Sequence, residues 1–184
     1  MNKILLILIF TNFLLYADSS VDIQKELQGM PNAEQEKIEH FFRTLIKQYG
    51  FGYTLFGDKP VSLLCWLAEP DYNKKRPYFT VNEDFIESYS VWKKYEKKFP
   101  SNKYILQERT LAMGKDYIDL VLIKKTLFNE SIKNNNDFFS PGYDTDTFLK
   151  SEKLENYVNC SDEQKSKYHI RMGILLGYGS RAFS

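Results

Sequence analysis

Cys65 and His169 are the two side chains whose types could form a nucleophile and its base. A cysteine nucleophile needs a nearby base and surroundings that favour the thiolate. Cys65 lies instead within the apolar run LLCWL at 63–67, where burial raises a thiol pKa, and no glycine-rich oxyanion loop precedes it. We therefore expect a buried cysteine, or a disulfide with Cys160, and keep a small thiol-dependent hydrolase using Cys65 and His169 as the alternative.

Short motifs for phosphate and metal binding fail on the residues around them. Segment 52–59 is close to a phosphate-binding loop, but Asp58 occupies the position of its lysine and would repel phosphate. His40 has no second histidine at the spacing of H-E-x-x-H. The D-x-D triplet at 144–146 precedes an apolar-periodic segment, so helix capping accounts for it. We expect no metal site and no cofactor.

Four lysines alternate with aromatic side chains in segment 92–99, WKKYEKKF. Aromatic rings beside cations suit single-stranded nucleic acid, glycans or an anionic surface. The same spacing is typical of an ordinary half-buried helix with its aromatic residues on the buried stripe, which is the simpler interpretation. The candidate binding residues are Lys93, Lys94, Lys97 and Lys98.

The charge of the chain is balanced overall and uneven locally. Its 184 residues carry 25 basic and 24 acidic side chains, which argues against a general nucleic-acid binder. Residues 71–103 hold eight basic and five acidic side chains, whereas residues 137–163 hold two basic and seven acidic ones. Such asymmetry can orient a partner, and it can also reflect two solvated faces.

The N-terminal segment has the pattern of a signal peptide. Lys3 precedes an apolar stretch at 4–16, and Ala17 precedes a polar run. The stretch is shorter than the roughly 20 residues that span a bilayer comfortably. We expect residues 1–17 to be cleaved, with an uncleaved anchor as the alternative, and residues 18–184 to form one soluble domain, periplasmic or secreted, without a membrane span.

Apolar periodicity and turn residues predict the secondary structure. Helical spacing, with caps at Asn32, Asn82 and Ser161 and stops at Gly50, Pro100 and Gly177, predicts helices at 33–49, 83–98, 124–133, 147–157 and 161–176. Strands are predicted at 51–56, 61–67, 78–81, 103–109 and 117–123, with a turn at 57–60. Segment 117–128 also fits one helix, but its β-branched residues favour a strand. The expected fold is α+β: a small, mostly antiparallel sheet flanked by helices, with a helical C-terminal third.

Three segments together resemble a known group of proteins. They are FGYTLFGDKPVS at 51–62, LVLIKK at 120–125 and GILLGYG at 173–179. They resemble an uncharacterised family of exported proteins from obligate intracellular bacteria. The resemblance implies a bacterial envelope or host-facing location, and it implies no activity. Its glycine-containing turns at 57–60 and 177–179 are further candidates for a functional surface, although glycines there also suit tight turns.

Export, the lack of a coherent catalytic set and the uneven charge favour a non-enzymatic binding or interaction protein. We expect a protein partner in the envelope or in a host, and no nucleic acid. The sequence leaves the oligomeric state open.

Overall fold

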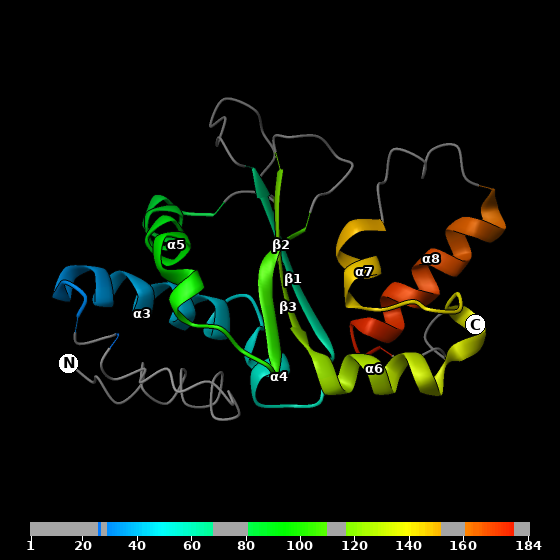
Figure 1. The fold of residues 1–184 in the computed structure, drawn as a ribbon. Coiled ribbons are helices and arrows are strands. Elements are labelled where there is room, and N and C mark those ends of the chain that lie inside the picture. The colour runs from blue at the N-terminus through cyan, green and yellow to red at the C-terminus, as the bar shows by residue number, and fades with distance from the viewer. Residues whose placement is uncertain (1–25, 27–28, 68–80, 110–116, 152–160, 179–184) are drawn as a thin grey trace.

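A three-stranded antiparallel sheet separates two groups of helices (Figure 1). The computed structural model describes residues 26, 29–67, 81–109, 117–151 and 161–178. Figure 1 shows α3 and α5 on one side of the sheet and α7 and α8 on the other, while α4 and the start of α6 lie at one end of it. The predicted α+β class, with a helical C-terminal part, is confirmed.

The described elements follow the chain in this order. The strands are β1 (Val61–Leu67), β2 (Tyr104–Arg109) and β3 (Tyr117–Lys124). The α-helices are α3 (Asn32–Lys47), α4 (Gly52–Leu55), α5 (Glu83–Tyr95), α6 (Lys125–Asn134), α7 (Thr145–Ser151) and α8 (Asp162–Leu175), and two 3₁₀ turns are η2 (Glu96–Lys98) and η3 (Asn136–Phe138).

The central strand β3 explains why two separate cores form. The strand order is β1-β3-β2, and both neighbours run antiparallel to β3. Side chains alternate between the faces of a strand. Leu120 and Leu122 therefore join the core shared with α3 and α5, whereas Val121 and Ile123 join the core shared with α6, α7 and α8. An apolar run of four residues thus supplies both faces of the sheet.

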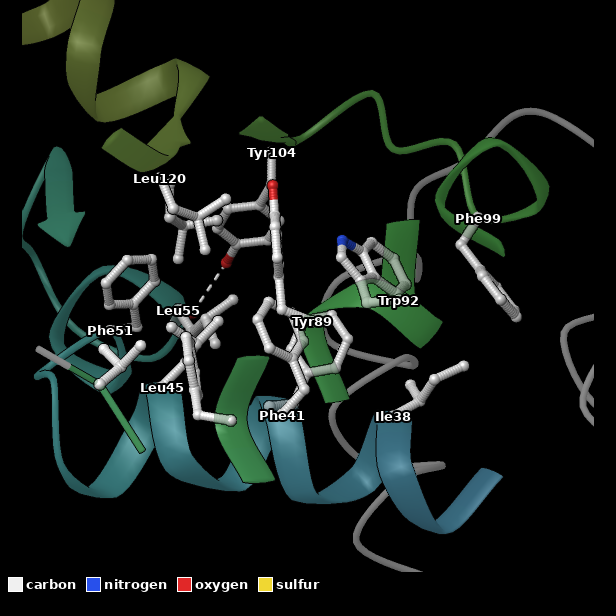
Figure 2. Packing of buried hydrophobic residues seen from close by; sticks show 14 of the residues in the cluster. Ile38, Phe41, Leu45, Phe51, Leu55, Tyr89, Trp92, Phe99, Tyr104 and Leu120 are labelled. Carbon is white, nitrogen blue, oxygen red and sulfur yellow. Dashed lines mark hydrogen bonds between the residues drawn. The ribbon is translucent and has the colours of Figure 1, made fainter. Parts of the chain in front are cut away.

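Aromatic side chains dominate the core between α3, α5 and the sheet (Figure 2). The Phe41 ring lies 5.5 Å from that of Phe85 and stacks on that of Trp92 at 6.2 Å. Trp66 of β1 meets Phe85 edge-on at 5.6 Å. The aromatic residues of α3 and α5 recur every three or four positions, so the predicted apolar stripes are the buried faces of these two helices. The second core is also aromatic, with Phe128 of α6 5.6 Å from Phe148 of α7.

The helix ends agree with the predicted caps in two cases and differ in one. The Asn82 side chain accepts a hydrogen bond from the Phe85 backbone N–H at 2.8 Å. Ser161 and Gln164 form the capping box expected from their spacing. The prediction for Asn32 is wrong, because the backbone carbonyl of Pro31 accepts the first helical bonds and Asn32 is already helical.

The predicted strand at 51–56 is wrong, because this segment contains the short helix α4. Phe51 and Leu55 are buried on the same side, four residues apart. Thr54, which lies between these two residues in the sequence, is also fully buried. Its hydroxyl lies 2.8 Å from the Ser62 hydroxyl. Alternation along a strand would place Tyr53 on the same face as Phe51 and Leu55, yet Tyr53 is 72% exposed. One helical turn instead buries Phe51, Thr54 and Leu55 together. The hairpin expected at 51–67 is therefore a helix, a turn and β1.

Of the remaining predicted elements, some are confirmed and others lie outside the described residues. Segment 117–128 is a strand followed by a helix, since β3 ends at Lys124 and α6 begins at Lys125. Most of the predicted strand at 78–81 and the end of the predicted helix at 147–157 lie outside the described residues. The predicted signal peptide and Cys160 lie outside them as well.

Candidate functional site

A groove of about 280 Å³ runs along strand β2. Its walls come from α5, η2, the following loop and β2: Trp92, Glu96, Lys97, Phe99, Pro100, Ser101, Tyr104, Ile105, Leu106 and Gln107. Ile105 and Leu106 are neighbours on a strand, so their side chains point to opposite faces of the sheet. A groove that both of them line follows the edge of the strand itself.

Buried contacts hold the two walls of the groove in place. Trp92 and Phe99 stack at 6.0 Å and are both buried (Figure 2). The Ser101 hydroxyl accepts hydrogen bonds from the backbone N–H groups of Lys103 and Tyr104 at 3.3 and 3.1 Å, which fixes the loop before β2. The Tyr104 hydroxyl donates to the Leu55 carbonyl at 2.7 Å, which ties β2 to α4. The groove is therefore preformed.

The backbone of β2 offers hydrogen-bonding groups on the groove side. The Lys125 N–H donates to the Lys103 carbonyl at 3.0 Å. Lys103 and Lys125, which lie opposite each other at the end of the β2–β3 ladder, are therefore a hydrogen-bonded pair. Ladder bonds then alternate along β2, and the N–H and C=O groups of Leu106 and Glu108 point away from β3. No strand in the described part of the chain pairs with this side of β2. The groove thus has an open strand edge as its floor.

The four candidate lysines do not form one free cationic patch. Lys93 pairs with Glu96 at 3.0 Å and lies 3.8 Å from Glu108, so α5 is tied to both η2 and β2. Two further ion pairs, Lys94–Glu34 at 2.6 Å and Lys98–Glu26 at 3.1 Å, involve lysines on the outer surface. A ligand of these three lysines would compete with carboxylates already in place.

Lys97 differs from the other three candidate lysines. It is exposed, it lines the groove, and it forms no ion pair with any described residue. Among the predicted binding residues, Lys97 is therefore the one that the structure places against a concave surface and leaves without a counter-ion. The β2 residues of the groove were not predicted, because strand alternation marks a strand without showing that it lies at a sheet edge.

Cys65 lies in a polar row that crosses the sheet. Its register partner on β3 is Asp119, whose own partner on β2 is Arg109. Burial, with the Asp119 carboxylate as a second cause, raises the pKa of the half-buried Cys65 thiol to about 11. The thiol is therefore protonated at neutral pH and is a poor nucleophile.

His169, the proposed base, is exposed on α8 and packs against its neighbour Tyr168 at 5.6 Å. The charged groups that shift the pKa of Cys65 are Asp119 and Arg109. The geometry thus gives the thiol-dependent hydrolase no support. Cys65 is a free thiol among the described residues, and the Cys65–Cys160 disulfide stays a prediction.

Arg109 and Asp119 form a buried ion pair beside this thiol. The Arg109 Nε donates to Asp119 Oδ2 at 2.7 Å, and both side chains are almost fully buried. The guanidinium lies 4.8 Å from the Phe148 ring of α7, a cation–π contact that joins the pair to the second core. Burial raises the pKa of Asp119, while the guanidinium opposes this shift. The pair has a structural use, linking β2, β3 and α7.

No group of three or more metal-ligating side chains gathers among the residues that the structure describes. In the D-x-D triplet, Asp144 accepts a hydrogen bond from the Thr147 backbone N–H at 2.7 Å. Asp146 pairs with Lys150 at 3.3 Å. The capping predicted for this motif is thus made by Asp144, while Asp146 forms an ordinary helical ion pair.

Within the described ranges, no helix is both long and apolar enough to cross a bilayer. No family model, curated protein or solved structure matches the chain. The groove must therefore be interpreted from its own chemistry.

Proposed function

We propose that the protein is an exported, non-enzymatic binding protein that takes an extended segment of a partner protein as an added strand on β2. The observation that carries the proposal is the groove whose floor is the open edge of β2. An extended peptide supplies the alternating N–H and C=O groups that such an edge lacks. The pattern of a signal peptide at 1–17 supports a partner in the envelope or in a host.

The lining of the groove indicates which peptide it suits. Phe99, Pro100 and Ile105 offer apolar walls, and an apolar side chain of the peptide would lie between them. Lys97, which has no ion pair in the described part of the chain, favours an acidic residue in the same peptide. The preferred partner segment is therefore extended, with apolar and acidic side chains.

Selection of short random peptides on the purified protein tests this function. We expect the selected peptides to be extended and to slow amide hydrogen exchange at Leu106 and Glu108, whose N–H groups point outward. Protection confined to other elements, or failure to select any peptide, would remove β2 as the binding edge.

A matched pair of variants at one position isolates the backbone contribution. Glu108→Pro removes an outward N–H, and proline is tolerated at a sheet edge. Glu108→Ala removes the same side chain, including its hydrogen bond from Tyr89, and keeps the N–H. We expect about a tenfold weaker peptide affinity for Glu108→Pro than for Glu108→Ala, with both proteins folded by circular dichroism. Equal affinities would contradict strand addition.

A further inference from the structure

Two turns that lie far apart in the sequence meet at one end of the sheet. A Cβ atom added at Gly177, just after α8, would lie 3.5 Å from Lys59 Cγ and 3.9 Å from Pro60 Cδ. Figure 1 shows α4, the start of α6 and the end of α8 converging there. Both glycine-containing turns noted in the sequence thus contribute to one surface, which lies at the opposite end of β3 from Asp119.

Three large aromatic side chains project from this surface into solvent. Tyr53 is 72% exposed, Phe56 55% and Tyr178 65%, and these are the exposed large apolar side chains of the described residues. No ring contact joins any two of them in the described part of the chain. They are therefore three separate projections and do not form one compact apolar patch.

The backbone beneath these rings is fixed. At α8 the Gly177 N–H donates to the Ile174 carbonyl and the Tyr178 N–H to the Gly173 carbonyl, at 3.0 and 2.8 Å, with Gly177 at a φ of +80°. This pair of bonds is a Schellman motif, and it holds Tyr178 in place. At α4 the Lys59 N–H donates to the Tyr53 carbonyl at 3.3 Å. The aromatic side chains are thus presented from rigid turns.

Four lysines lie on the segments that meet at this end: Lys59, Lys103, Lys124 and Lys125. Backbone bonds place them together, since the Lys124 N–H donates to the Pro60 carbonyl at 2.9 Å and the Lys125 N–H to that of Lys103 at 3.0 Å. None of the four forms an ion pair with a described residue. Asp58 is the acidic residue of the same turn, so the set carries a net charge of +3.

The local structure adds to the positive charge of this surface and fixes the position of two of its lysines. Helix α6 begins at Lys125, and the positive end of its dipole is therefore at this surface. All four lysines are half-buried. The Lys124 Nζ donates to the Gly57 carbonyl at 2.8 Å and the Lys125 Nζ to the Ser101 carbonyl at 3.4 Å, so backbone oxygens hold these two charges at this end. We define the aromatic–lysine end as these four lysines with Tyr53, Phe56 and Tyr178.

We propose that the aromatic–lysine end binds the surface of an anionic membrane. Tyrosine side chains partition into the headgroup region, phenylalanine inserts at the boundary with the acyl chains, and lysines beside them are attracted to anionic lipids. Protein-binding hot spots favour clustered apolar side chains in desolvated pockets, whereas these three rings are separate. A lipid surface, in contrast, can bind each of the three aromatic side chains separately. This binding is peripheral, and none of the residues of the aromatic–lysine end lines the groove on β2.

Vesicle flotation tests the proposal. The full chain is mixed with phosphatidylcholine vesicles that contain or lack phosphatidylglycerol, at low and high salt. We expect binding to the anionic vesicles, weakened by salt, and little binding to the neutral ones. The double variant Lys103→Gln, Lys125→Gln should bind anionic vesicles about 25-fold more weakly, at about five-fold per lysine. The triple variant Tyr53→Ser, Phe56→Ser, Tyr178→Ser should lose about tenfold.

A control variant with the same net charge distinguishes binding by the aromatic–lysine end from an effect of the overall charge of the protein. Lys97→Gln, Lys133→Gln removes two lysines that are not part of the aromatic–lysine end and that form no ion pair with a described residue. We expect it to bind anionic vesicles as the unchanged protein does, and Glu108→Pro to do the same. Equal losses in the two double variants would overturn the proposal. So would binding to immobilised polyglutamate without binding to vesicles, which would assign the surface to an acidic protein.

Discussion

Arg109 Nε donates a hydrogen bond to Asp119 Oδ2 at 2.7 Å inside the sheet, where side-chain exposure is 5% for the arginine and 3% for the aspartate. Asp119 is also the register partner of Cys65. The pair joins the hairpin of β2 and β3 to α7 through the contact of Arg109 with Phe148. Removal of either partner alone would leave the other charge buried without its counter-ion.

We expect Asp119→Ala to lower the free energy of unfolding by about 3–5 kcal/mol, because it leaves the buried Arg109 charge without a partner. Urea unfolding measures the change. The double variant Arg109→Met, Asp119→Leu should recover most of this loss, since it buries no charge. If Asp119→Ala were as stable as the unchanged protein, the pair would not be buried as described.

Cys65 should react slowly in the folded, reduced protein. Its pKa is raised to about 11 from an ordinary 9.0, so at neutral pH the thiolate fraction is about a hundredfold below that of an unfolded chain. The rate of alkylation by iodoacetamide should rise about tenfold per pH unit toward 11 and should reach the ordinary rate in urea. Alkylation of the folded protein at the unfolded rate would revive the thiol-dependent hydrolase.

The intact mass of the natively expressed protein tests export and the disulfide together. We expect a chain that begins at Asp18, because the first 17 residues have the pattern of a signal peptide. After alkylation without reductant, the absence of alkyl groups would mean that Cys65 and Cys160 are paired. A mass that retains residues 1–17 would contradict cleavage and favour an N-terminal anchor.

Gly57 should tolerate alanine less well than Gly142. A Cβ atom at Gly57 would lie 2.8 Å from the Tyr53 carbonyl oxygen, which is backbone and cannot move aside cheaply. We expect Gly57→Ala to cost about 1–3 kcal/mol in urea unfolding. Gly142 has a φ of +79° and open space around it, so alanine there costs only the left-handed conformation, about 1 kcal/mol. The reverse order of stabilities would show that the turn after α4 is not rigid.

Substitution of Ser161 tests the capping box that begins α8. The Ser161 side chain accepts from the Gln164 N–H at 3.3 Å, and the Gln164 side chain accepts from the Ser161 N–H at 2.9 Å. Ser161→Ala should lower the free energy of unfolding by about 1 kcal/mol, whereas Ser161→Asp should retain most of the stability. Equal losses in both variants would mean that the cap does not stabilise α8.

The sequence by itself determined the elements whose signals are local. Caps at Asn82 and Ser161, the stop at Gly177 and the apolar stripes of α3 and α5 depend on residues within about four positions of each other. Such signals can be read without knowing the fold. The β-branched residues of segment 117–123 indicated β3 for the same reason.

Only the tertiary structure decided which distant segments meet. The period of 51–56 fitted a strand, yet the structure buries Thr54 against Ser62 and leaves Tyr53 exposed, which a helical turn achieves. The strand order, the open edge of β2, the row from Cys65 to Arg109 and the meeting of Gly177 with Lys59 all join residues far apart along the chain. Such contacts form where burial of both partners outweighs the entropy of closing the loop between them, and no local pattern records that balance.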